Sequence, residues 1–204
     1  MLQTQTVSPE LLELLKSIST TEIFSEYILV GGTALALQIG HRNSIDLDFF
    51  YNKPIDENLF IETLSQFGDI KKIGGSENVL VLSINNIKVD FVNHKYPFID
   101  KPIEINGIKM ASKKDISAMK LNAIEGRGTK KDFIDLYFLM NDFSLPEMID
   151  FYRQKYPNHS DFMMLKSLTY FEDAEIMPTP KMFKTFDWEQ CKTTILREFI
   201  KLNI

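Results

Sequence analysis

The sequence predicts an α+β fold, with a mixed β-sheet core and flanking helices in residues 1–111 and an all-helical part in residues 112–204. Two tight-turn signals support the sheet, because Asn85-Asn86 and Asn106-Gly107 each separate two short apolar runs, as in β-hairpins. From Ser112 onward, helix-capping sequences replace the turn signals. We therefore expect two domains, with the helical C-terminal domain packed on the α/β core.

Local signals place the elements of the first part. Ser8-Pro9 begins a helix as N-cap and first-turn proline. An apolar strand at 27–30 ends on Gly31-Gly32, and the helix that follows at 33–39 ends at Gly40. We expect the remaining elements to be a helix at 56–67, strands at 45–51, 69–73, 79–84, 87–92, 103–105 and 108–110, and a loop at 74–76.

Capping sequences also place the helices of the second part. Residues 112–115 resemble a capping box before a helix that continues through 116–124, and residues 129–132 form a second cap before a helix at 133–141. Gly126-Arg127-Gly128 breaks the chain between the two. We expect the last three helices at 146–155, 161–170 and 188–202.

Composition narrows the class of protein. Hydrophobic residues make up 44% of the 204 residues and charged residues 25%, which is ordinary for a soluble globular protein. The single cysteine, Cys191, excludes an internal disulfide and a cysteine-rich zinc site, so we expect a cytoplasmic protein. No run reaches the roughly 18 apolar residues of a membrane helix, and the N-terminus lacks a signal-peptide pattern. We expect no membrane partner.

Charge is distributed unevenly along the chain. The net charge is -5 and the pI is near 5.3, so the sequence has no global signature of nucleic-acid binding. Residues 1–70 hold three basic and ten acidic side chains, whereas residues 101–131 hold eight basic and three acidic ones. A metal-binding acidic half and a phosphate-handling basic stretch would explain this split, and so would ordinary solvated charge.

Three acids interrupt apolar strands. Asp46 and Asp48 share one face of the predicted strand 45–51 and are costly to bury unless a cation neutralises them. Oxygen ligands favour Mg²⁺ or Mn²⁺. Asp90 repeats the pattern in the strand 87–92, and beside the first pair it would complete a three-carboxylate site that holds metal or takes a proton. The alternative is strands whose acids simply face water.

The glycine turn before this acidic strand is a candidate phosphate site. Gly31 and Gly32 allow close backbone approach, and the helix that starts at Thr33 directs unpaired N–H groups toward an anion. The Thr33 hydroxyl adds a donor, and we expect Arg42 and Ser44 in the next loop to bind substrate as well. Glycines at such a place also serve only to turn the chain.

A second group of charged residues lies in the helical part. Lys120 or Arg127 could neutralise charge that develops on a phosphate, and Lys131 follows on the next helix. The Gly-Arg-Gly break predicts that two helix ends converge here. Asp132 is either a functional acid or an ordinary capping acid at a helix start.

The motifs in combination resemble the nucleotidyltransferase AbiEii/AbiGii toxin family. The similar runs are GGTAL at 31–35, SIDLDFF at 44–50, KVDF at 88–91, MKLNAIEGRGTKKDFIDL at 119–136 and SLTYFEDAE at 167–175. The resemblance extends from about residue 27 to the C-terminal helix. It implies a polymerase-β-like nucleotidyltransferase core followed by a helical part, and it implies transfer of a nucleotide from an NTP to an acceptor.

The resemblance also implies residue roles and partners. By position, Asp46 and Asp48 match the metal ligands and Asp90 the third carboxylate, while Lys120 matches a phosphate-binding lysine and Asp132 a late acid. Either Asp90 or Asp132 would be the general base. For characterised relatives the acceptor is the 3′ end of tRNA, and the family supplies the toxin of toxin–antitoxin or phage-defence pairs, so a cognate antitoxin is an expected partner.

One departure and two alternatives accompany this expectation. Thr33 stands where many nucleotidyltransferases have serine, and its methyl group crowds the turn. The acceptor could instead be a small molecule or a protein side chain, with the same fold. A non-catalytic chain that keeps the fold for partner binding is the other alternative.

Overall fold

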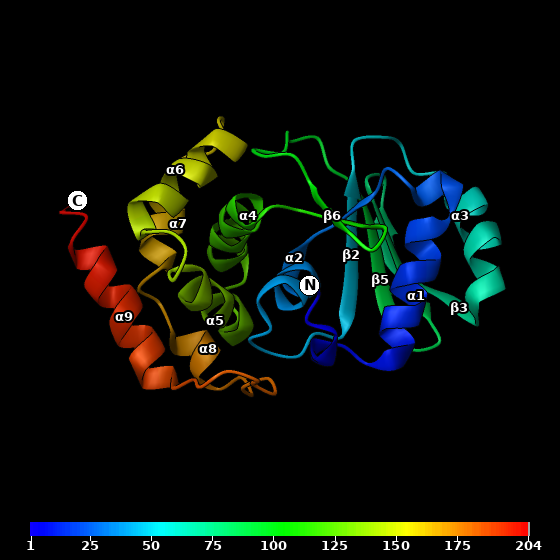
Figure 1. Cartoon of the computed structure of the whole chain (residues 1–204). Helices are drawn as coiled ribbons and strands as arrows, with labels where there is room; N and C mark the ends of the chain where they lie inside the picture. Colours follow the sequence, from blue (N-terminus) through cyan, green and yellow to red (C-terminus); the bar gives the residue numbers. More distant parts are fainter. Residues whose placement is uncertain (204) are drawn as a thin grey trace. The chain divides into compact units, whose positions relative to one another are not determined.

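The computed structural model describes residues 1–203, which divide into two compact units (Figure 1). The first unit comprises Met1–Pro97 and Lys101–Ala111; the second comprises Phe98–Asp100 and the chain from Ser112 onward. Within the described residues, no helix is both long enough and apolar enough to cross a membrane.

A mixed sheet forms the centre of the first unit. Within residues 1–203, seven strands pair in the order β3-β4-β5-β2-β1-β7-β6. They are β1 (Ile28–Leu29), β2 (Asp46–Tyr51), β3 (Ile70–Ser76), β4 (Val79–Ile84), β5 (Ile87–Asn93), β6 (Ile103–Ile105) and β7 (Ile108–Met110). β2 runs parallel to β5 and β1 parallel to β7, while the other neighbours are antiparallel. The mixed α+β prediction is confirmed.

Helices cover both faces of this sheet. Figure 1 shows α2 (Gly31–Ile39) on one side and α1 (Pro9–Thr20) and α3 (Glu57–Leu64) on the other. Short 3₁₀ turns lie before α1 at Thr4–Thr6, between α1 and β1 at Glu22–Phe24, and after α3 at Ser65–Phe67. Ser8 caps α1 as predicted, because its Oγ accepts from the Leu11 amide at 3.1 Å.

Aromatic packing fixes which face of the sheet is apolar. The Phe91 ring stacks on Phe49 at 5.4 Å between centroids and contacts Phe24 at 5.0 Å and Phe60 at 5.2 Å. Side chains alternate between the two faces along each strand. Because Phe49 and Phe91 are buried on the α3 side, the residues next to them in β2 and β5 point to the α2 side. The acids of β2 and β5 therefore share the face that α2 covers.

The predicted hairpins are confirmed, and one predicted loop is wrong. Asn85 and Asn86 have φ of 49° and 66°, the left-handed pair of a tight hairpin turn, and Asn106-Gly107 turn in the same way. Residues 74–76, expected as a loop, instead continue β3, with a register shift between Lys72 and Gly74. Two adjacent glycines normally indicate a loop, but a bulge accommodates them within β3.

The second unit is helical. Its helices are α4 (Lys113–Gly126), α5 (Lys130–Leu139), α6 (Leu145–Lys155), α7 (Phe162–Ser167), α8 (Glu172–Glu175) and α9 (Trp188–Ile200). α4 packs against α5, α6 and α7. The Ser112 cap of α4 is confirmed, with Oγ accepting from the Asp115 amide at 3.1 Å. α5 begins three residues before its predicted start, and α8 was not predicted.

Candidate active site

Strand pairing aligns the acids of the first unit. In the parallel register of β2 and β5, Asp48 is the Cα partner of Asp90 and Asp46 is the partner of Lys88. Paired residues of a parallel ladder point to the same face, so these four side chains share one face. The fold thus brings together the two acidic segments, which are about forty residues apart in the sequence.

Asp90 is already engaged by a cation of its own strand. Lys88 Nζ pairs with Asp90 Oδ2, and the Asp90 side chain is 17% exposed. Its other oxygen, Oδ1, is buried and has no hydrogen-bond partner among the described residues. A buried carboxylate oxygen left without a donor is costly, so this atom is suited to receive a proton donor or a cation.

The donor set suits a hard divalent cation, although a three-ligand group is not assembled. Among residues 1–203, no group of three or more His, Cys, Asp or Glu side chains is placed to hold a metal ion. The predicted trio of Asp46, Asp48 and Asp90 is therefore not preformed, and the Lys88 contact to Asp90 gives a physical reason. Carboxylate oxygens and the bare Asp90 Oδ1 still match the ligands that Mg²⁺ and Mn²⁺ prefer.

The glycine turn lies directly against the acidic face. Gly31 has φ of +68°, a left-handed conformation, and a Cβ added there would lie 2.7 Å from Asp48 Oδ2. A Cβ on Gly32 would lie 2.5 Å from the nearest terminal nitrogen of Arg42. Close approach therefore favours glycine at both positions, and the left-handed backbone favours it at Gly31 as well. The start of α2, with its unpaired N–H groups, is next to a carboxylate and a guanidinium.

The Thr33 hydroxyl is used inside the protein. It donates to the backbone carbonyl of Asp46 and is hydrogen-bonded to Ser44 Oγ at 2.8 Å, while the residue is 1% exposed. Thr33 therefore ties the first turn of α2 to the start of β2. This geometry favours a positioning role for the hydroxyl over direct donation to a phosphate.

Arg42 and Ser44 lie in the loop that leads into β2. Arg42 is 3% exposed, and one of its terminal nitrogens donates to the Asn43 carbonyl at 2.8 Å. The Ser44 amide donates to the Thr6 carbonyl at 2.8 Å, so the N-terminal segment holds this loop in place. Both predicted substrate contacts thus belong to a fixed loop beside the glycine turn.

In the second unit, Lys120 is the centre of a buried ion cluster. Its Nζ lies 3.0 Å from Asp132 Oδ1 and 2.5 Å from Asp135 Oδ2, and the Lys120 side chain is 5% exposed. Both carboxylates are fully buried. Such a cluster persists only because each charge is compensated by the others. These contacts join the middle of α4 to the first turns of α5.

Arg127 closes the cluster from the outer side. Its Nε donates to Asp132 Oδ2 at 2.9 Å and a terminal nitrogen to Oδ1 at 3.0 Å, a two-point contact, and Thr129 Oγ1 donates to Oδ2 at 2.5 Å. Burial raises the pKa of Asp132, but the Lys120 charge and the Arg127 and Thr129 contacts outweigh it and hold that pKa well below its usual range. Asp132 is therefore a weak proton acceptor.

The remaining predicted residue, Lys131, is exposed on the first turn of α5. The sequence interpretation missed a second buried ion pair in this unit, between Asp115 and Lys155. A signal existed, because Lys155 continues the buried series Met148, Ile149 and Tyr152 on α6 at helical spacing. A lysine on the core face of an amphipathic helix requires a buried partner.

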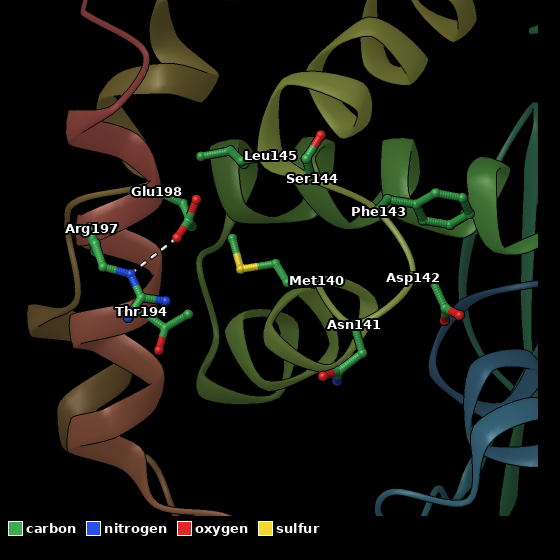
Figure 2. A pocket seen from close by; sticks show the side chains of 9 residues that line it. All are labelled: Met140, Asn141, Asp142, Phe143, Ser144, Leu145, Thr194, Arg197 and Glu198. Carbon is green, nitrogen blue, oxygen red and sulfur yellow. Dashed lines mark hydrogen bonds and ion pairs between the residues drawn. The ribbon is translucent and has the colours of Figure 1, made fainter.

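A groove of about 420 Å³ runs along α9 (Figure 2). Its walls are the Met140–Leu145 turn on one side and Thr194, Arg197 and Glu198 on the other (Figure 2). Arg197 Nε pairs with Glu198 Oε1 at 3.0 Å. None of the site residues predicted from sequence lines this groove, so it gives no support to a catalytic role there.

Comparison with known proteins places this chain among nucleotidyltransferases. The family model described as "Nucleotidyl transferase AbiEii toxin, Type IV TA system" matches residues 13–201. An uncharacterised protein of Aquifex aeolicus (strain VF5) is 38% identical over 168 residues, covering 79% of this chain and 82% of that protein. The family match includes the acidic strands, the glycine turn and most of the helical unit.

Solved structures show the same fold at low identity. MenT4, a nucleotidyltransferase toxin of Mycobacterium tuberculosis H37Rv, is similar with a TM-score of 0.57 and 14% identity, covering 95% of this chain and 82% of MenT4. ANT(2″)-Ia in complex with adenylyl-2″-tobramycin gives a TM-score of 0.55 and 12% identity, covering 74% of this chain and 97% of that one. At these identities the likeness establishes the fold.

Proposed function

Because the chain belongs to the AbiEii family of nucleotidyltransferase toxins, we propose that it transfers a nucleotide from an NTP to the 3′ end of tRNA. The reaction joins the terminal hydroxyl oxygen to the α-phosphorus, breaks the bond between the α-phosphorus and its bridging oxygen, and releases pyrophosphate. The type IV toxin–antitoxin family implies an NTP substrate and an antitoxin partner. We propose cytoplasmic tRNA as the acceptor.

The observation that carries this proposal is the parallel pairing of Asp48 with Asp90 beside the Gly31 turn. A transferase for phosphate-bearing substrates needs carboxylates for a cation and backbone donors for phosphate oxygens in one place. The first unit contains both within a single sheet and the helix that follows β1. If these acids simply faced water on an edge strand, they would not lie in contact with the first turn of a helix.

We assign Asp46 and Asp48 as the ligands of a divalent cation, Mg²⁺ or Mn²⁺, with Asp90 as a third carboxylate. When bound, the cation would neutralise negative charge on the triphosphate. The first N–H groups of α2 bind phosphate oxygens, and the left-handed Gly31 allows the backbone to approach them. Arg42 adds positive charge beside Gly32.

We assign the general base to Asp90 rather than Asp132. The buried Oδ1 of Asp90 has no hydrogen-bond partner among the described residues, so it can accept the proton of an acceptor hydroxyl. Asp132 is held by three donors that keep its pKa low, so its part is to hold Lys120 and Arg127. Proton transfer to a carboxylate whose pKa is held well below its usual range is unfavourable.

We propose that Lys120 and Arg127 neutralise negative charge on the phosphates of the NTP. Arg127 is 58% exposed, and its two-point contact with Asp132 fixes the direction of its guanidinium. An arginine that is held in place and accessible to solvent is suited to bind a phosphate. Lys120 is nearly fully buried, so its part is electrostatic unless the cluster opens. Lys131, exposed on α5, is a further candidate phosphate contact.

A labelling assay tests the proposal directly. The full chain is incubated with each of four α-³²P-labelled NTPs, total tRNA and Mg²⁺, and the products are separated on a denaturing gel. We expect one or two of the NTPs to label tRNA, and the label to be lost when the 3′-hydroxyl is first oxidised with periodate. Labelling that survives periodate would place the transfer elsewhere on the RNA and contradict the proposed acceptor.

The same assay separates the alternatives. In a cell extract, label recovered in the small-molecule fraction would favour an acceptor of the kind suggested by the ANT(2″)-Ia fold, and label in protein would favour a side-chain acceptor. If no fraction takes up label and calorimetry detects no NTP binding, the chain uses the fold for partner binding only.

A further inference from the structure

The segment that joins α8 to α9, residues 176–187, is a closed loop (Figure 1, orange). Its two ends are tied together, because Trp188 Nε1 donates to Glu175 Oε2 at 2.8 Å. Lys130 Nζ, from α5, donates to the Glu175 carbonyl at 3.0 Å and fixes the same point to the helices. Compact loops with joined ends are frequently functional.

The loop is anchored as well as closed. Phe186 packs its ring against Tyr137 and Phe138 of α5, with centroids 6.1 Å and 6.2 Å away. Pro178 and Pro180 restrict the backbone of the outgoing arm. A loop held in this way presents its remaining side chains in a fixed arrangement, which lowers the entropy cost of binding a ligand.

The side chains that the loop presents are cationic and aromatic. Phe183 is 37% exposed, and Lys181 Nζ lies 5.2 Å from the centre of its ring. Lys184 is exposed one residue further on. From residue 176 to residue 186 the chain carries these two lysines and no acid, although the whole protein has a net charge of -5. The last residue of the loop, Asp187, is an acid that caps α9, since its Oδ1 accepts from the Gln190 amide at 2.8 Å. Residues 181–184 are therefore a cationic segment with a partly exposed aromatic ring.

From this combination we propose that residues 181–184 bind single-stranded nucleic acid, with a base stacked on Phe183 and phosphates contacted by Lys181 and Lys184. Aromatic rings with neighbouring cations are the sequence-tolerant contacts by which proteins bind unpaired strands. This inference rests on the proposed function, because it identifies where a tRNA acceptor end with unpaired bases is held.

An anionic membrane surface is the competing ligand for exposed lysines and a phenylalanine. Stable attachment to a membrane surface uses a broad apolar face along an amphipathic helix. The loop has one partly exposed ring, Phe183, with the Lys181 ammonium over it. Such a ring is better suited to stack on a nucleic-acid base than to insert among lipid acyl chains. The observations therefore favour nucleic acid.

Fluorescence anisotropy of the full chain with a labelled 12-nucleotide single-stranded RNA tests the proposal. We expect Phe183→Ala to weaken binding about tenfold, as loss of one stacked base does, and Phe183→Trp to restore it. Lys181→Ala/Lys184→Ala should lower the slope of log K against log salt by about 1.4, because two phosphate contacts are removed from a single strand.

Matched variants elsewhere in the chain serve as controls. Phe162→Ala removes a ring that is 67% exposed on α7, and Lys16→Ala/Lys166→Ala removes two exposed lysines outside the loop. Neither should change the affinity or the salt slope. Circular dichroism and the thermal midpoint of every variant exclude unfolding as the cause of a change.

Steady-state transfer separates this inference from the proposed function. We expect the loop variants to raise KM for acceptor RNA about tenfold with kcat within about twofold and KM for NTP unchanged. Normal transfer with unaltered RNA affinity in the loop variants overturns the inference and leaves the proposed function intact. Loop-dependent RNA binding without any transfer supports the inference and overturns the function. Loop-dependent binding to phosphatidylglycerol vesicles without RNA binding overturns it in favour of a membrane.

Discussion

Asp48 and Asp90 are paired residues of two parallel strands, and their side chains share the face of the sheet that α2 covers. A parallel pair needs a crossover connection, which here includes α3, β3 and β4. The sequence therefore separates the two acids widely while the fold joins them. This pairing is the structural basis for assigning the two acids to one proposed site.

The first prediction concerns the acids of β2. Asp46→Ala and Asp48→Ala should each lower the rate of nucleotide transfer by roughly three orders of magnitude, since a lost cation ligand removes several kcal/mol of charge stabilisation. The rate is measured as label incorporated into RNA per minute at saturating NTP and Mg²⁺.

Asp69→Ala is the matched control for these variants, because Asp69 is an exposed acid just before β3. It should retain full activity. The thermal midpoint of both β2 variants should stay within a few degrees of the parent chain, as loss of partly exposed acids predicts. Full activity in either β2 variant would rule out the metal assignment.

The second prediction concerns the glycine turn. Gly31→Ala should destabilise the protein by about 1–2 kcal/mol because φ is +68° there, and it should also reduce transfer because the new methyl group meets Asp48 Oδ2. Gly126→Ala is the matched control, since a Cβ there meets nothing within 4 Å at the end of α4. It should be neutral or stabilising by up to about 1 kcal/mol.

Urea denaturation measures both changes in the free energy of unfolding, and the labelling assay measures activity. Equal behaviour of the two alanine variants would mean that close approach at Gly31 is unimportant. A Gly31→Ala variant that is destabilised but fully active would separate the turn from the site.

Local signals predicted most of this fold because they act within a few residues. The Asn85-Asn86 and Asn106-Gly107 turns and the Ser8 and Ser112 caps each depend on backbone geometry that the residue type dictates. The Gly74-Gly75 segment was mispredicted for the opposite reason, since its pairing with β4 through a bulge is a long-range contact.

The candidate site was predictable in its residue types and less so in its contacts. Alternation along the strands placed Asp46, Asp48 and Asp90 correctly on shared faces. The same alternation puts Lys88 and Asp90 on one face of β5 but does not show that they form an ion pair. No sequence pattern indicated that Asp132 would be held by three donors. Such contacts depend on side-chain directions and burial, which only tertiary packing fixes.

The third prediction concerns the buried cluster around Asp132. Asp132→Asn should lower the free energy of unfolding at pH 7 by about 3–5 kcal/mol, because it leaves the Lys120 charge incompletely compensated. The folded pKa of Asp132 is depressed, so its stabilisation is fully present above the unfolded pKa, about 3.9, and is lost as pH falls through the folded pKa.

Urea titrations at pH 7, 5 and 3 measure this dependence. The difference between the parent chain and Asp132→Asn should be constant from pH 7 to pH 5 and should shrink only below about pH 4. Asp142→Asn is the control, because its pair with Lys113 is more than a third exposed and should contribute at most about 1 kcal/mol. A difference that grows on acidification would contradict the assigned direction of the pKa shift.

The fourth prediction concerns Asp115 and Lys155, whose charged atoms lie 2.9 Å apart with both side chains fully buried. Asp115 Oδ1 also accepts from the Ile99 amide at 2.9 Å, and Oδ2 accepts from the Asp100 amide at 3.2 Å and the Ser112 hydroxyl at 2.8 Å. The carboxylate thus holds the segment Phe98–Asp100 to the start of α4.

Asp115→Asn should therefore cost more stability than Lys155→Met, because an amide oxygen and nitrogen cannot accept from both backbone amides and the lysine together. Each single variant should lose about 3–5 kcal/mol, and the double variant should lose less than the sum by about 2 kcal/mol. Amide hydrogen exchange at Ile99 and Asp100 should accelerate in Asp115→Asn and stay slow in Lys155→Met. Additive losses, or unchanged exchange at both amides in Asp115→Asn, would show that this pair does not anchor the segment.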